Sequence, residues 1–215
     1  MKGLFITFEG TEGSGKTTQI SLLAARLRSM GYSVRTLREP GGTPIGEEIR
    51  HTLKHSPANH AMTSEAELLL MNASRAQLVR EVIRPALASG EVVLCDRFYD
   101  STTAYQGYGR QLDLRMVKNM IDVAVEDTRP DLTLLFIVPH EVSEARRVAR
   151  QPTLPLPFKR DRMEEADRSF FMRVAEGYQA IAAAEPQRVR QFDATGEVAT
   201  THAAIWKLVQ PLLAR

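Results

Sequence analysis

This chain of 215 residues has a single cysteine, no long apolar run and almost no excess of one charge. The single cysteine, Cys95, excludes an intramolecular disulfide framework and a thiolate-bound zinc cluster, and it is typical of a reducing compartment. Lys and Arg total 28 against 26 Asp and Glu, a formal net charge of +2. That balance argues against an unspecialised nucleic-acid binder. A hydrophobic content of 43% excludes a disordered chain.

Membrane and export signals are also missing. The longest uncharged apolar run, residues 132–140, is far shorter than the roughly 18 residues that span a bilayer. The N-terminal MKGLFITFEG reaches an acidic residue too early to contain the apolar core of a signal peptide. We therefore expect no membrane partner and a cytoplasmic location.

Short apolar runs alternate with helical patterns along the chain. The runs that predict strands are 4–8, 33–37, 92–95, 132–138 and 189–192. Continuous apolar character is typical of strands that are buried on both faces of a parallel sheet. The alternation predicts an α/β fold of three layers, with a five-stranded parallel sheet and helices on both faces. The length suits one domain over residues 1–215.

Helix boundaries are marked by caps and breakers. The apolar stripe from Ile20 to Met30 predicts a helix that Gly31 ends. The S-x-x-E pattern at 64–67 predicts a capping box at the start of a second helix, which runs toward Gly90. Pro85 is expected to kink or shorten that helix.

The segment GTEGSGKT at residues 10–17 matches G-x-x-x-x-G-K-[ST]. Its glycines allow torsions that aim successive N–H groups at one anion, and the following helix adds its N-terminal partial charge. In such loops the lysine, Lys16, reaches the β and γ phosphates, and the hydroxyl of Thr17 ligates Mg²⁺. We therefore predict a P-loop NTPase fold that binds ATP and Mg²⁺. The predicted phosphate-binding residues are Gly10, Thr11, Glu12, Gly13, Ser14, Gly15, Lys16, Thr17 and Thr18.

Basic residues gather at the same predicted sheet edge. Lys16, Arg38 and Arg97 each follow a predicted strand, and parallel strands present their carboxyl ends on one side. Arg75 borders the apolar stripe of the second helix, so it needs a partner. That partner is either an acid such as Glu67 or the anionic or carbonyl group of a ligand.

These cations exceed what one Mg²⁺-bound nucleotide requires, which predicts a phosphotransferase whose acceptor carries a phosphate. A monophosphate is already largely dianionic at pH 7, so the acceptor needs little help from a general base. The enzyme has to align the two phosphate groups and neutralise their charge. Residues 151–168 hold three of the 11 prolines and a dense mixture of charges. Such a run is usually a solvated loop, but beside a phosphate site it can exclude water. We interpret 146–168 as a mobile lid.

Further segments carry a family resemblance. They are FEGTEGSGKTTQ, REPGGT, DRFYDSTTAYQG, RPDLTLLF, DRME and FDAT. Over nearly the whole chain they resemble, in order, the phosphate loop, second-strand loop, D-R motif with A-Y-Q segment, fourth strand, lid motif and adenine-side loop of the thymidylate kinase family. REPGGT and the A-Y-Q segment are far more specific than the phosphate loop. The resemblance implies transfer of the γ-phosphate of ATP to dTMP, giving dTDP for dTTP biosynthesis.

The resemblance also implies individual roles. Arg38 and Arg97 match arginines that hold the dTMP phosphate, and Arg75 matches one that hydrogen-bonds a thymine carbonyl. Thr102 falls where a polar side chain meets thymine N3–H, and Tyr105 where a ring excludes a ribose 2′-hydroxyl. The implied dTMP-binding set is Glu12, Arg38, Met71, Arg75, Arg97, Thr102, Tyr105 and Gln106. The implied catalytic set is Lys16, Arg97, Arg162, Glu12 and Asp96, and the implied metal ligands are Thr17 and Asp96.

Two features concern the subtype. Glu12 is followed directly by Gly13 and Ser14 rather than by a basic residue, a pattern that in this family accompanies lid arginines. Arg162 is the best match, followed by Arg150 and Arg146. At the stacking position, where many members have phenylalanine, this chain has Met71, which can pack a base through its polarizable sulfur. Selectivity between dTMP and dUMP is therefore open.

Two alternative functions remain. A deoxynucleoside kinase shares a phosphate loop and an acid–arginine motif, but it phosphorylates a sugar hydroxyl and needs a carboxylate base. A P-loop nucleotide switch protein would require a guanine-reading N-K-x-D motif, which the sequence lacks. The resemblance also implies a homodimer, with the helix over 64–90 as the expected interface.

Overall fold

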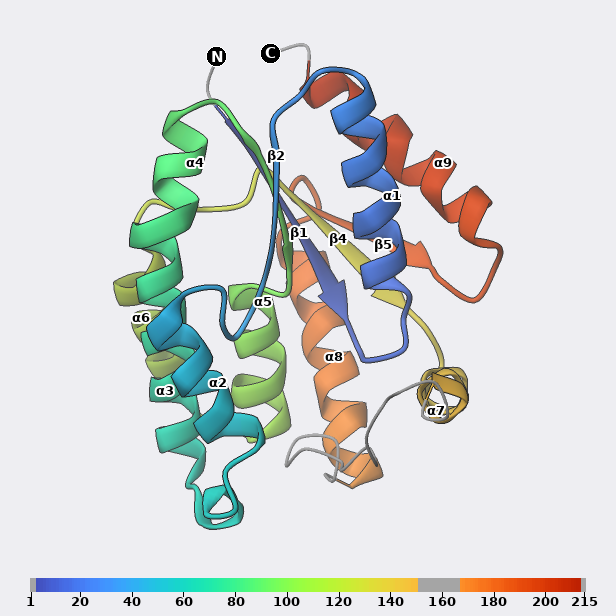
Figure 1. Cartoon of the computed structure of the whole chain (residues 1–215). Coiled ribbons are helices and arrows are strands. Elements are labelled where there is room, and N and C mark those ends of the chain that lie inside the picture. The colour runs from blue at the N-terminus through green and yellow to red at the C-terminus, as the bar shows by residue number, and fades with distance from the viewer. Residues whose placement is uncertain (1–2, 151–166, 214–215) are drawn as a thin grey trace.

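The computed structural model describes residues 3–150 and 167–213. A five-stranded sheet lies at its centre, in the order β2-β3-β1-β4-β5. The strands are β1 (Leu4–Gly10), β2 (Val34–Arg38), β3 (Val92–Asp96), β4 (Leu132–Ile137) and β5 (Val189–Asp193). All four neighbouring pairs are parallel. The predicted parallel sheet is therefore confirmed, with helices on both faces (Figure 1).

The described helices follow the strands. They are α1 (Lys16–Ser29), α2 (Pro44–Lys54), α3 (Ser64–Leu78), α4 (Arg84–Ala88), α5 (Tyr99–Thr102), α6 (Leu114–Val125), α7 (His140–Arg150), α8 (Arg168–Ala184) and α9 (Val198–Val209). Two π turns, Val79–Ile83 and Thr103–Gly109, continue α3 and α5. Short 3₁₀ turns cover Asn59–Ala61 and Gln210–Leu212. None of the described helices is long and apolar enough to cross a membrane.

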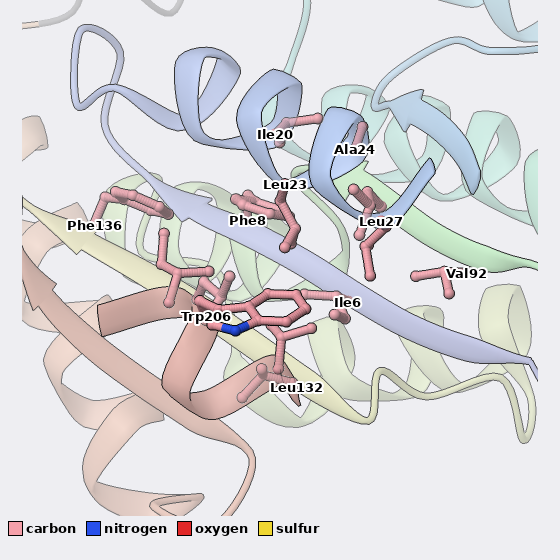
Figure 2. Packing of buried hydrophobic residues seen from close by; sticks show 14 of the residues in the cluster. Ile6, Phe8, Ile20, Leu23, Ala24, Leu27, Val92, Leu132, Phe136 and Trp206 are labelled. Carbon is pink, nitrogen blue, oxygen red and sulfur yellow. The ribbon is translucent and has the colours of Figure 1, made fainter. Parts of the chain in front are cut away.

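The two faces of β1 separate the core into layers. Ile6 and Phe8 pack against Leu23 of α1 and Trp206 of α9 (Figure 2). Phe5, on the opposite face, packs with α3 and α6 residues, and α8 covers β4 nearby. Burial of apolar surface contributes a free energy of roughly 25 cal/mol per Å², and it is the main force that holds the layers together.

The structure extends or corrects several predicted boundaries. β1 continues past Phe8 to Gly10, because Glu9 and Gly10 still pair with β4. Met30 is half-exposed and lies just beyond α1, so it is not part of the buried stripe, whereas Gly31 has the expected positive φ of 88°. The glycine relieves the strain that a side chain would meet there.

The predicted capping box is wrong by one residue. The cap of α3 is Thr63, whose Oγ1 accepts from Ala66 N at 3.2 Å. Glu67 is fully buried and therefore does not serve the helix end. The helical pattern changes at 79–83 into a π turn just before Pro85, in line with the expected interruption.

Candidate functional site

The phosphate loop joins β1 to α1 and depends on its glycines, which all have positive φ. A Cβ on Gly10 would lie 2.4 Å from the carbonyl oxygen of Phe136, so no larger residue fits. Gly15 has φ 94° at the N-terminus of α1, a left-handed conformation that glycine adopts without strain. The backbone thus curves tightly into the helix N-terminus, where the helix dipole favours a phosphate.

Lys16 lies across this loop. Its Nζ donates to the carbonyl oxygens of Gly10 at 3.0 Å and Thr11 at 2.8 Å. Burial and then the positive charge of Arg97 lower the pKa of Lys16 to about 8, although nearby carboxylates oppose the shift. A bound phosphate would supply the counter-charge that this buried ammonium group needs.

Thr17 and Asp96 provide two oxygen ligands beside the loop. Thr17 Oγ1 donates to Asp96 Oδ2 at 3.4 Å, although the residues are far apart in sequence. A hydroxyl and one carboxylate, completed by water and phosphate, form a donor set that suits Mg²⁺. The described residues contain no group of three or more His, Cys, Asp or Glu that could hold a metal without such help. The residues present therefore fit the implied Mg²⁺.

A cavity extends from the phosphate loop to the ends of β2 and β3. Its lining contains all eight residues predicted to bind dTMP. They are Glu12, Arg38, Met71, Arg75, Arg97, Thr102, Tyr105 and Gln106. Gly13 to Thr17 and Asp96 line the same cavity, whereas Gly10, Thr11 and Thr18 lie outside its lining. The fold therefore brings the two predicted binding sets together.

Arg97 follows β3 with a positive φ of 68°, which is unusual for a residue with a side chain. Its backbone N donates to Phe8 O at 2.9 Å, which anchors this strained turn to β1. Its Nη1 donates to Ser101 Oγ at 3.2 Å and Tyr178 OH at 3.4 Å, and Nη2 donates to Tyr105 OH at 3.3 Å. Hydroxyls from three helical segments therefore orient a guanidinium in the cavity wall.

Arg75 is part of an internal ion pair as well as the cavity lining. Its Nε donates to Glu39 Oε2 at 2.8 Å, Nη1 to Asn72 Oδ1 at 3.0 Å, and Nη2 to Phe98 O at 3.3 Å. The prediction that Glu67 could be this partner is wrong. Glu67 lies two turns earlier in α3 and pairs with other residues.

Glu67 has its own buried partners. It accepts from Gln106 Nε2 at 2.8 Å and forms an ion pair with Arg110 at 3.1 Å. This contact ties α3 to the segment that carries Gln106. A buried carboxylate needs such partners, which explains why Glu67 is unavailable to cap the helix.

Arg38 leaves the end of β2 and lies on the exposed rim of the cavity. Its Nη2 forms an ion pair with Glu47 at 2.8 Å, and its Nη1 donates to Pro40 O at 2.9 Å. Arg50 donates to the same carbonyl at 2.9 Å and also lines the cavity. Sequence reasoning missed Arg50 and its helical neighbour Lys54, although their i, i+4 spacing after REPGGT was a usable signal.

Other lining residues were also missed. They are Glu39, Pro40, Phe98, Ser101 and Phe171. Phe171 comes from α8, directly after the segment outside the described residues, and no motif of the sequence marked it. It contributes an aromatic ring to the cavity that Met71 also lines.

Arg146 of α7 lies against the FDAT loop rather than in the cavity lining. Its Nη1 donates to Ala194 O at 2.8 Å and its Nη2 to Thr195 O at 3.3 Å. Ser143, one turn earlier, donates from Oγ to the backbone oxygen of Glu12. Arg150 is the last residue of α7, and Arg162 lies outside the described residues.

The parallel sheet, the glycine loop with Lys16, and a second cluster of arginines in one cavity define a P-loop phosphotransferase. Residues 8–205 match the family model described as thymidylate kinase. Thymidylate kinase of Chlorobium luteolum is 48% identical over 207 residues, 95% of each chain. That of Pseudomonas syringae pv. tomato is 48% identical over 213 residues, 99% of this chain and 98% of the relative.

Structural similarity agrees with the sequence similarity. The crystal structure of thymidylate kinase from Ehrlichia chaffeensis matches with a TM-score of 0.77 and 32% identity, over 98% of this chain and 99% of that one. The chain belongs to the thymidylate kinase family.

Proposed function

We propose that the cavity holds dTMP beside the phosphates of ATP and that the residues lining it act on these two substrates. Thymidylate kinases use ATP and Mg²⁺, and as a member of that family this chain is an ATP:dTMP phosphotransferase that produces dTDP. One observation carries the proposal for the site. Arg38, Arg75 and Arg97 share a cavity with the phosphate loop, so cationic groups face both ends of the transfer.

The reacting centre needs alignment and charge neutralisation more than proton transfer, because the acceptor phosphate is already an anion. Lys16 would bind the phosphates of ATP, and Arg38 and Arg97 would hold the phosphate of dTMP in line with them. Mg²⁺, held through Thr17 and Asp96, would neutralise phosphate charge. Glu12 also lines the cavity, where it would contact the acceptor sugar.

At the base end, the partners of Arg75 determine which of its protons remain for a ligand. Glu39, Phe98 O and Asn72 occupy several of its five N–H groups and fix the plane of the guanidinium. An arginine held in this way would direct a remaining N–H at a thymine carbonyl. Thr102 and Gln106 would meet the polar edge of the base, and the Tyr105 ring would crowd a ribose 2′-hydroxyl.

We further propose that residues 146–168 form the lid of a single domain and that Arg162, followed by Arg150 and Arg146, supplies transition-state charge. The absence of a basic residue directly after Glu12, where the chain has Gly13, supports this role. Arg162→Ala should reduce kcat by orders of magnitude and leave the Kd for dTMP nearly unchanged. An unchanged kcat would contradict the role of Arg162. Arg146 also has a backbone-binding role at the FDAT loop, so Arg146→Ala should additionally raise the KM for ATP.

A homodimer and a cytoplasmic location complete the proposal. Two large apolar side chains support the dimer, since Leu69 of α3 is 55% exposed and Val123 of α6 is 69% exposed. Such side chains on neighbouring helices suit a covered surface. Light scattering should report twice the monomer mass, and Leu69→Glu with Val123→Glu should shift the mass to that of the monomer. A monomeric parent protein would contradict this assembly.

The most direct test separates a phosphate acceptor from a hydroxyl acceptor. The protein is incubated with labelled ATP, Mg²⁺ and either dTMP or thymidine, and the products are separated by chromatography. Labelled dTDP from dTMP, with little labelled dTMP from thymidine, is the expected result. The reverse pattern would favour the deoxynucleoside kinase alternative.

A further inference from the structure

Glu9 is a buried acid with no role in the site described so far. It lies near the end of β1 on the face opposite Phe8, and its side chain is inaccessible to solvent. Its Oε1 accepts from Phe98 N at 2.7 Å. Its Oε2 accepts from Ser101 Oγ at 2.6 Å and from Tyr178 OH at 3.0 Å. Donors from α5, including its N-cap residue Phe98, and from α8 therefore converge on one carboxylate.

The same two hydroxyls contact Arg97. Ser101 Oγ and Tyr178 OH accept from Arg97 Nη1 at 3.2 Å and 3.4 Å, and they lie 3.0 Å from each other. Arginine can only donate, so each hydroxyl must turn its lone pairs toward Arg97 and its proton elsewhere. Glu9 Oε2 is the acceptor that takes both protons. The carboxylate thereby determines the direction in which both hydroxyls point.

The electrostatic surroundings agree with this arrangement. Burial, with the charge of Glu9, raises the pKa of Tyr178 well above its usual value, so the phenol retains the proton that it donates. Desolvation and Asp100 raise the pKa of Glu9 to about 7, whereas its contacts with Ser101 and Phe98 N and the charge of Arg97 act in the opposite direction. The charge of Arg97 thus favours the ionised form of Glu9, against burial and Asp100, which favour the protonated form.

We propose that Glu9 is a positioning residue for the acceptor phosphate: through Ser101 and Tyr178 it aims Arg97 into the cavity. The inference rests on the proposed function, since it takes Arg97 as a ligand of the dTMP phosphate. The same carboxylate also accepts from Phe98 N, directly after Arg97, so it fixes the backbone next to the strained Arg97 residue.

Glu9→Gln isolates this effect because it keeps the shape and inverts the polarity at one atom. If the amide NH₂ faces the hydroxyls, they must accept from it and lose lone pairs for Arg97. If the amide turns over, its NH₂ meets the N–H of Phe98 instead. Either orientation removes the negative charge and one required acceptor.

The test compares ligands with and without a phosphate. Titration calorimetry measures the Kd of dTMP, thymidine and ATP for the parent protein and Glu9→Gln. Loss of a hydrogen bond to a charged group predicts a Kd for dTMP that rises by about tenfold or more, with thymidine and ATP nearly unchanged. Tyr178→Phe, which removes one of the two linking hydroxyls and leaves the acid, should shift the Kd of dTMP in the same direction by less.

Arg97→Ala provides the matched background. There, Glu9→Gln should have no further effect on dTMP binding, because the guanidinium that it aims is absent. Equal weakening of dTMP and thymidine, or an undiminished effect in the Arg97→Ala background, would overturn the proposal. If Glu9→Gln does not fold, Tyr178→Phe carries the same comparison. A parent protein that binds thymidine as tightly as dTMP would instead contradict the proposed function.

Discussion

Arg75 and Glu39 form a buried ion pair between α3 and the loop that follows β2. The Arg75 Nη2 to Glu39 Oε2 distance is 2.7 Å, and the two side chains are 2% and 4% exposed. Among the described residues, Oε1 of Glu39 is the buried side-chain oxygen or nitrogen that has no hydrogen-bond partner. Burial raises the pKa of Glu39, and Arg75 counteracts that shift. The pair orients the residue proposed to read thymine.

Breaking this pair should destabilise the protein strongly. Glu39→Ala leaves the Arg75 charge buried without its carboxylate, and we expect the free energy of unfolding in urea to fall by about 3–5 kcal/mol. The control is Glu91→Ala, which removes the partner of the half-exposed Arg35. A surface pair of that kind contributes about 0–1 kcal/mol. Similar losses in both variants would contradict a special role for the buried pair.

Arg38→Ala should weaken the binding of the acceptor dTMP and leave the binding of the donor ATP nearly unchanged. Loss of a charge-assisted contact to phosphate predicts a KM for dTMP that rises roughly 10- to 100-fold, with the KM for ATP little changed. Steady-state kinetics with each substrate varied in turn checks this. Arg35→Ala is the matched control, since Arg35 lies on the same strand but pairs with Glu91 outside the cavity. An equal rise in that control would assign the effect to β2 as a whole.

The metal requirement should depend on the hydroxyl of residue 17. Thr17→Val keeps the shape but removes the oxygen that lies beside Asp96, so the Mg²⁺ concentration for half-maximal activity should rise about tenfold or more. Thr17→Ser retains the oxygen and should remain near the parent value. Activity is measured against free Mg²⁺ at saturating ATP and dTMP. Identical Mg²⁺ curves for the valine and serine variants would contradict the assignment.

Glu9 should also leave a signature in the pH dependence of stability. Its folded pKa of about 7 lies above the ordinary value of 4.5. Between these values the native state binds more protons than the unfolded state, so the contribution of Glu9 to the free energy of unfolding falls as pH rises. Glu9→Gln lacks this titration. The stability of the parent minus that of the variant, measured by urea unfolding with EDTA present, should therefore decline from about pH 4.5 to 7 and then level off. A difference that rises over this range would contradict the shift.

The sheet and phosphate loop could be predicted from the sequence because their signals are local. A continuous apolar run predicts a buried strand whichever strand it pairs with. The residues of G-x-x-x-x-G-K-[ST] determine the backbone torsions of the loop within a short segment. Caps are less certain, because Thr63 and Ser64 are both suitable and tertiary packing decides between them. Glu67 could not be assigned locally, since its partners lie near residue 106 in another helical segment.

Partners that are distant in sequence account for most of what was missed at the site. Arg75 was recognised as an arginine that needs a partner, but Glu39 lies 36 positions earlier in a loop whose path only the fold defines. Glu9 belongs to a strand that the apolar pattern ended at Phe8. Its partner Tyr178 lies 169 positions away on α8. Periodicity and motifs contain no information on such pairs, because they depend on how the layers pack.

The central claim is that this cavity selects a deoxynucleoside monophosphate that carries thymine as the acceptor. It is tested most directly by kcat/KM for dTMP, dUMP, AMP, GMP and thymidine, with ATP and Mg²⁺ saturating and ADP release followed by a coupled assay. The account predicts the highest value for dTMP and far lower values for AMP, GMP and thymidine. The dUMP value shows how strongly Met71 and the base pocket favour the thymine methyl group. Faster turnover of thymidine or AMP than of dTMP would contradict the account.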